Sequence, residues 1–220
     1  MKSFNFNTLF LDMNIQDFQN YIEFMEENIL RHKKNIEDEF EEKVKELNLT
    51  DPEEQQALFE YLYDDQYHAD TYKQILRKSL FLSLYSFVET QLKSIAIKLE
   101  KKELTKIKLN DISHSGIPQY LFFIETVHNI QIDISKDLRK QFLGYNILRN
   151  HFVHNDRFPV NKKKYQTVKL IKGVKIDDSP IHDDKFYIDK ITSDFNRIYL
   201  EKIQQFFNKL HEALETIDFY

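Results

Sequence analysis

A mostly helical fold, built as a bundle of long amphipathic helices, is predicted by three features of the sequence. The 220 residues include only 3 Gly and 4 Pro, too few for the many tight turns of a β sandwich or barrel. Apolar residues make up 41% of the chain and include 19 Phe and 12 Tyr, enough for an aromatic core. They recur every three to four positions over long stretches, which is typical of helices. The length predicts a single domain.

The absence of cysteine excludes several kinds of chemistry. A chain with no Cys has no disulfide framework, no thiolate zinc site and no thiol nucleophile, and this favours an intracellular compartment. The first residues are polar at intervals and lack a small-residue cleavage site, and no window holds the roughly 18 apolar residues of a membrane span. We therefore expect a soluble, cytoplasmic protein with no membrane partner.

The N-terminal half predicts three helices. The first runs from Phe18 to about Leu47, and residues 48–52 break it, with Thr50 or Asp51 as N-cap and Pro52 at the first helical position of the next. A polar stretch at residues 64–70 separates the second helix from a third, over residues 72–99, which is expected to be the most central.

The C-terminal half predicts three more helices and a β hairpin. A fourth helix covers the apolar run at residues 119–127, and a fifth runs from Asp137 to about His154. The period then changes after residue 159. Val168 and Leu170, a Lys172-Gly173 turn, then Val174 and Ile176, with a partner strand at residues 186–191, predict a β ribbon. The last helix returns at Phe195. Within one domain we thus expect four segments: acidic N-terminal helices (13–64), central helices (70–155), a basic β-hairpin insert (160–191) and a C-terminal helix (192–217).

Charge is distributed unevenly along the chain, although the net charge is only −5. Residues 21–65 hold 15 acids and five bases, whereas residues 157–176 hold seven bases and no acid. The basic block is either a solvated loop or a surface for phosphates. As RNA-binding candidates we select Arg157, Lys162, Lys163, Lys164, Lys169 and Lys172. Tyr165, among these lysines, is the candidate for stacking on a base.

The end of the fifth predicted helix carries the strongest polar concentration. The sequence has no glycine-rich phosphate loop, no Gly-x-Ser-x-Gly elbow and no His-Glu-x-x-His helix. Residues 149–157 instead hold two histidines, two arginines and two asparagines. Histidine exchanges protons near neutral pH and arginine binds phosphate with two hydrogen bonds, so an Arg and a His on one phosphodiester suffice for a metal-free ribonuclease.

Helix geometry limits how these residues can cooperate. On an unbroken helix Arg149 and His154 point about 140° apart, whereas Asn150 and His154 point about 40° apart. Either the helix breaks between them, or two chains combine their motifs across a symmetric dimer, which we favour.

Arg149, the polar Asn150 and His154 after four intervening residues, in a helical frame, resemble the motif of the HEPN superfamily (higher eukaryotes and prokaryotes nucleotide-binding). The resemblance implies a HEPN-like bundle and a dimeric, metal-independent endoribonuclease, often a toxin or an abortive-infection effector of anti-phage defence, sometimes held by an antitoxin. It implies His154 as general acid or base, Arg149 as stabiliser of phosphate charge, and Asn150 as the residue that orients one of them. One subgroup has a Tyr two residues after the His, and this chain has Asp156 there.

Other readings stay open for each candidate. Arg149 and His154 are also typical of cations at a helix C-terminus. His151 is expected to pack, or to support His154. Glu89 either reaches Arg149, supports the active site in another way, or faces solvent. His182, Asp183 and Asp184 resemble a metal fragment but are typical of a solvated loop, so we expect neither metal nor cofactor. The runs Phe122-Phe123 and Phe206-Phe207 are expected in the core.

Two other functional hypotheses remain. The first is a helical module that binds RNA, nucleotide or a partner protein without catalysis. The second is an interaction protein whose acidic long helix binds a basic partner through residues 37–42.

Overall fold

The computed structural model confirms a mostly helical chain with a two-stranded antiparallel hairpin before the last helix. It describes residues 6–102, 104–154, 159–177, 186–217 and 219, with side chains left out at 6–9 and 63–67. Over these residues, no helix is long and apolar enough to cross a membrane.

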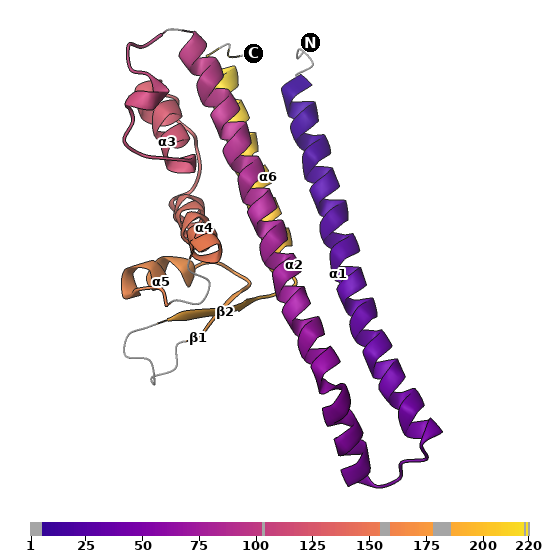
Figure 1. Ribbon diagram of the computed structural model, residues 1–220. Helices are drawn as coiled ribbons and strands as arrows, with labels where there is room; N and C mark the ends of the chain where they lie inside the picture. The colour runs from indigo at the N-terminus through magenta and orange to yellow at the C-terminus, as the bar shows by residue number, and fades with distance from the viewer. Residues whose placement is uncertain (1–5, 103, 155–158, 178–185, 218, 220) are drawn as a thin grey trace.

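Two long antiparallel helices, α1 (Phe6–Glu46) and α2 (Pro52–Lys101), form the axis of the molecule (Figure 1). The predicted break between them is confirmed: Asn48 has a left-handed φ of 50°, and the Asp51 side chain accepts a hydrogen bond from the backbone N–H of Glu53. Pro52 follows at the first helical position, where its missing N–H costs nothing. Of the two caps that the sequence left open, Thr50 and Asp51, the structure has Asp51.

Two helix boundaries predicted from the sequence are wrong. The first helix begins at Phe6 rather than Phe18, and the polar stretch at residues 64–70 does not separate two helices, because α2 continues through it. This stretch contains no Gly or Pro, so nothing in its backbone chemistry stops a helix.

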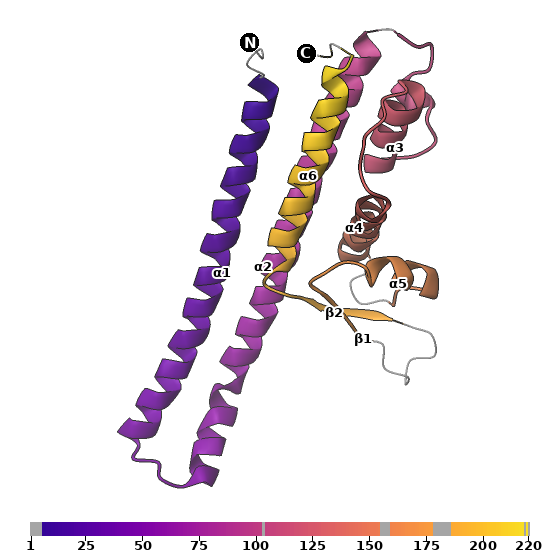
Figure 2. The same ribbon diagram turned by 180° about the vertical axis from the view of Figure 1, so that it is seen from behind.

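The remaining helices pack around the second half of α2. They are the short α3 (Ile117–Phe122), which continues into a π turn (Phe123–Val127), α4 (Lys136–His154) and α6 (Phe195–Glu215). A 3-10 turn (Leu109–Asp111) precedes α3. α3 and α4 lie on one side of α2, and α6 runs alongside it, as Figures 1 and 2 show from opposite sides. This confirms the central position expected for residues 72–99.

The core of this bundle is aromatic. Phe81, at 0% exposure, packs against Tyr145, Phe195 and Tyr199 with ring centroids 6.3, 5.3 and 5.3 Å away. These residues come from three helices, so one side chain of α2 joins α4 and α6.

The segment expected to be a β-hairpin insert at residues 160–191 is partly helical, which corrects the prediction. Residues Lys162–Val168 form α5, while the hairpin pairs β1 (Val174–Asp177) with β2 (Tyr187–Ile191). The Asn161 side chain caps α5 by accepting from the Lys164 N–H, and Tyr165 and Val168 are buried at helical spacing. The Lys172-Gly173 turn therefore links a helix to a strand.

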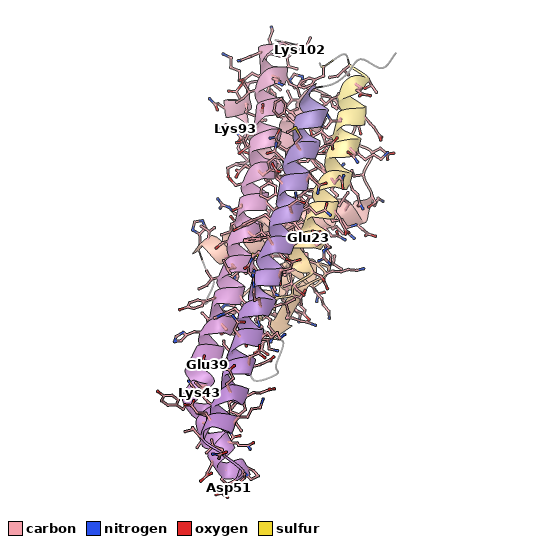
Figure 3. All side chains as sticks on the ribbon, turned by 90° about the vertical axis from the view of Figure 1, so that its right-hand side faces the viewer. Glu23, Glu39, Lys43, Asp51, Lys93 and Lys102 are labelled. Atoms are coloured by element: carbon pink, nitrogen blue, oxygen red, sulfur yellow. The ribbon has the colours of Figure 1, made fainter. Side chains whose placement is uncertain are left out.

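One polar junction ties α1, α2 and β2 together. Nε and Nη2 of Arg77 donate to the Glu26 carboxylate at 2.7 and 2.5 Å, and its Nη1 donates to the Ile191 carbonyl at 3.3 Å. Asn196 donates to the Arg77 carbonyl at 3.0 Å. We call residues 27–73, beyond this junction, the arm, and the rest of the chain the body. The connected ends of α1 and α2 extend past every other element (Figures 1 and 3).

Candidate functional site at the end of α4

α4 is an unbroken helix to His154, so it holds the three motif residues in a fixed relation. Leu148 is completely buried against the core, Arg149 is half-buried at its edge, and Asn150 and His154 are exposed. Arg149 and His154 therefore leave the helix about 140° apart and about 7.5 Å apart along its axis. Of the two arrangements that the sequence left open, a break in the helix between them is excluded.

Arg149 is held against α2 and against its own neighbour. Its guanidinium lies 5.9 Å from the centroid of the Tyr85 ring, and its Nη1 donates to Asn150 Oδ1 at 3.0 Å. The Tyr85 hydroxyl donates to Asn146 Oδ1 at 2.8 Å. Asn150 thus orients Arg149, and Tyr85 with Asn146 forms a support that the sequence analysis missed. The position of Asn146, three residues before Arg149 on one helix, was visible in the sequence, but the packing of α4 on α2, which brings Tyr85 to Arg149, was not.

Among the residues that the structure describes, Glu89 neither pairs with Arg149 nor faces open solvent, and its role in supporting the site stays a prediction. Its half-buried carboxylate lies under Gly116, whose Cβ, if present, would be 2.8 Å from Oε1. The described residues include no ion pair between Glu89 and Arg149. Burial, and then the Glu89 charge, raise the pKa of Tyr85 far above its usual value. Tyr85 therefore stays protonated and donates to Asn146 at neutral pH.

His151 is 5% exposed and meets the Phe152 ring at 5.8 Å, as expected of a packing residue. It also borders a cavity of about 270 Å³ between α4 and the start of α5. Asn150 lines this cavity from α4, and Asn161 and Lys164 line it from α5. The cavity brings a motif residue and a lysine of the basic block to one place.

The basic block lies beside α4 because α5 packs on it. The contact is close at Gly144, where a Cβ would be 2.7 Å from Cδ1 of Ile171. A lone glycine inside a helix often marks such an approach, and this signal was available in the sequence. The five described RNA-binding candidates are all exposed: Lys162, Lys163, Lys164, Lys169 and Lys172. Arg157 lies outside the described residues, as do His182, Asp183 and Asp184.

Two predictions about aromatic residues are wrong. Tyr165 is 7% exposed and stacks on Phe186 with centroids 3.8 Å apart, so its ring faces are engaged within the chain. It is therefore a core residue of the α5 and hairpin unit, rather than a platform for a base. Phe122 is 41% exposed, whereas Phe123, Phe206 and Phe207 are buried as expected.

Neither a metal centre nor a relative identifies the site. Within the described part of the chain, no three histidine or carboxylate side chains gather so as to hold a metal ion. Comparison of the chain with protein-family models, with curated proteins and with solved structures gave no match. The site is therefore interpreted from its residues.

Proposed function

We propose that this protein is a metal-independent endoribonuclease of HEPN type, acting as a toxin or anti-phage defence effector. One observation carries the proposal. The end of α4 carries Arg149, Asn150 and His154, and Asn150 borders the same cavity as Lys164, one of the exposed lysines of α5. An acid–base group, a phosphate-binding cation and a basic approach surface are what cleavage of RNA without a metal needs.

The chemistry uses the ribose 2′-hydroxyl as nucleophile. His154 takes the proton of that hydroxyl, the 2′-oxygen attacks phosphorus, and the bond to the 5′-oxygen breaks. The 5′-oxygen gains a proton from an imidazolium, leaving a 2′,3′-cyclic phosphate on one fragment and a 5′-hydroxyl on the other. Arg149 stabilises the charge on the non-bridging oxygens, which is greatest in the transition state. Exposed His154 is accessible to RNA in this role.

Two copies of the chain complete the proposed site. Arg149 and His154 diverge on one helix, so Arg149 of one copy is paired with His154 of the other. Leu143, 56% exposed, lies seven residues before Asn150 and eleven before His154, and these three side chains share one stripe within about 40°. An exposed leucine on the stripe of Asn150 and His154 supplies apolar surface for a symmetric contact between the two helices.

RNA cleavage in excess EDTA tests the activity. We expect wild-type protein to cut cellular RNA and leave 2′,3′-cyclic phosphate ends, and Arg149→Ala and His154→Ala each to lose a hundred-fold or more in rate. Matched controls are Arg31→Ala and His32→Ala, which remove the same residue types from exposed positions on α1. Undiminished cleavage by the motif variants would remove Arg149 and His154 from the mechanism.

Mixing the two inactive variants tests the two-chain site. In a random mixture of Arg149→Ala and His154→Ala chains, half of the dimers are mixed, and each mixed dimer has one intact site. The mixture should regain about a quarter of wild-type activity. No recovery, with subunit exchange verified by light scattering of tagged chains, would place the whole site in one chain.

A second candidate is a module that binds RNA without cutting it. The observation that favours it is the engagement of Arg149 with Tyr85 and Asn150 within the chain. In that case the triple variant Lys162→Glu, Lys163→Glu, Lys164→Glu abolishes RNA binding in a filter assay, while wild-type protein leaves the RNA intact.

A further inference from the structure

The arm contains an apolar groove between α1 and α2. The groove encloses about 670 Å³ and lies on the part of the two helices that no other element covers. Its apolar walls are formed by Ile29, Leu30, Ile36, Phe40, Phe59 and Leu62. Four of these come from α1 and two from α2.

Contacts between the helices close the groove at both ends. Toward the tip, the rings of Phe40 and Phe59 meet edge to face with centroids 5.9 Å apart. Toward the body, Arg77 and Glu26 form the ion pair of the junction. Along α1, the distance from Glu26 to Phe40 is about 21 Å, which is the length of about four helical turns.

The walls of the groove are only partly covered by the chain itself. Leu30 is 66% and Phe59 39% exposed, and Leu62 is the only buried residue among the described side chains of the arm. Two helices cannot enclose each other's apolar faces, and a further helix is the usual element that completes such a bundle. The groove therefore has the length and the apolar lining to receive one more helix.

Charge selects what kind of helix fits. The arm carries 14 acidic and six basic residues. Four of the six bases contact acids of the arm: Lys33 with Glu37 at 3.4 Å, Lys43 with Glu39 at 2.7 Å, Lys45 with Glu41 at 3.9 Å, and Lys73 with Asp70. The acids of the arm still exceed its bases by eight, and Glu39 and Asp51 in Figure 3 show that acids extend to the tip. This field repels RNA and a second acidic arm, and it attracts a helix that carries Lys or Arg.

We propose that the arm is a docking site for a basic amphipathic helix of a partner protein. The helix places its apolar side chains, spaced at three and four residues, in the groove, and its basic side chains against the acidic surface of the arm. About fourteen of its residues span the groove. This site is separate from the end of α4. Binding of the helix to the arm can therefore be tested whether or not the protein cleaves RNA.

Binding of a designed peptide tests the proposal on the full chain. The probe is a fluorescein-labelled 18-residue peptide of Leu, Ala and Lys with its leucines on one helical face, measured by anisotropy at 150 mM salt. Two controls are a peptide of the same composition with scattered leucines, and a peptide with Glu in place of Lys. We expect the amphipathic Lys peptide to bind at least ten-fold more tightly than either.

Matched variants locate the binding. Leu30→Ser with Phe59→Ser removes apolar wall from exposed positions, and should weaken binding at least ten-fold, whereas Leu104→Ser, 69% exposed in the body, should not. Glu37→Lys with Glu41→Lys should weaken it similarly. Glu201→Lys with Glu212→Lys makes the same change in net charge on α6, and should have a much smaller effect. Helical content by circular dichroism verifies that each variant is folded.

Three outcomes would overturn the proposal. The first is equal binding of the amphipathic and scattered peptides, and the second is binding that the arm variants leave unchanged. The third is self-association in sedimentation experiments that Leu30→Ser and Phe59→Ser abolish, because the groove would then belong to a second copy of the chain.

Discussion

The arm and the body share one helix, α2, yet they bury very different amounts of it. In the body, Leu84, Val88 and Leu92 are all at 0% exposure, whereas the arm portion of α2 buries only Leu62 among its described side chains. Helix propensity continues through both portions, and what differs is the number of neighbours. Stability within a continuous helix is therefore set by the elements packed around each part of it.

The largest difference in stability is expected between two variants that each remove a phenylalanine ring, one from the body and one from the arm. Phe81→Ala should lower the free energy of unfolding by about 3–5 kcal/mol, because it leaves a cavity among the five rings that contact Phe81. Phe59→Ala should cost about 1 kcal/mol or less, because this ring is already 39% exposed. Urea unfolding of the two variants measures the difference, and equal losses would contradict the comparison.

The junction between the regions should give the next largest effect. Arg77→Leu leaves the Glu26 carboxylate, 13% exposed, without its partner, and should destabilise the fold by about 3 kcal/mol. Lys33→Leu breaks the exposed pair with Glu37 and should change stability by less than about 0.5 kcal/mol. Urea midpoints compare the two, and hydrogen exchange should show faster opening of the arm in Arg77→Leu. An equal loss of stability in Arg77→Leu and Lys33→Leu would contradict this prediction, because the junction pair would then stabilise the fold no more than an exposed pair does.

The smallest effect should be a pH dependence that arises in the body. Burial lowers the pKa of His128 and of His211 below the usual value of about 6.5. As the pH falls below about 6.5, the unfolded chain binds protons that the folded chain does not, so stability decreases; above that pH their contribution is constant. A double variant, His128→Gln with His211→Gln, lacks both histidines. Between pH 7.5 and pH 5 its free energy of unfolding should fall by less than that of the wild type.

The matched change for that experiment is His32→Gln, which removes an exposed histidine from the arm. Melting temperatures at the two pH values, taken for all three proteins, separate the buried histidines from the carboxylates, which the variants leave in place. A double variant with the pH dependence of wild type would show that the buried histidines do not contribute.

Local chemistry made part of the fold predictable. Asp51 and Pro52 predicted the start of α2, and the spacing of Leu138, Phe142, Tyr145 and Leu148 predicted the buried face of α4. The β2 strand was placed within one residue of its start. These features depend on residues close in sequence, where capping, backbone and periodicity rules apply directly.

Features that depend on distant neighbours were missed or misassigned. Tyr165 looked like a free stacking residue because Phe186, which covers it, is 21 positions away. The strand expected at Val168 is a helix end, since an apolar pair can face a core in either form. For the candidate site, the motif residues were found, but the support of Arg149 by Tyr85 was not.

By itself, the sequence determined that the chain is mostly helical and that a break at residues 48–52 separates α1 from α2. It also determined that Arg149, Asn150 and His154 lie at the end of one helix, and that acidic and basic residues fall in separate segments. Only the tertiary structure decided that α2 belongs to both the body and the arm, and that the arm has a partly uncovered groove. It also decided that Arg149 packs on Tyr85, and that the packing of α5 on α4 places the lysines beside α4. The reason is physical: periodicity and capping act within a few turns, while burial is decided by which segments meet in space.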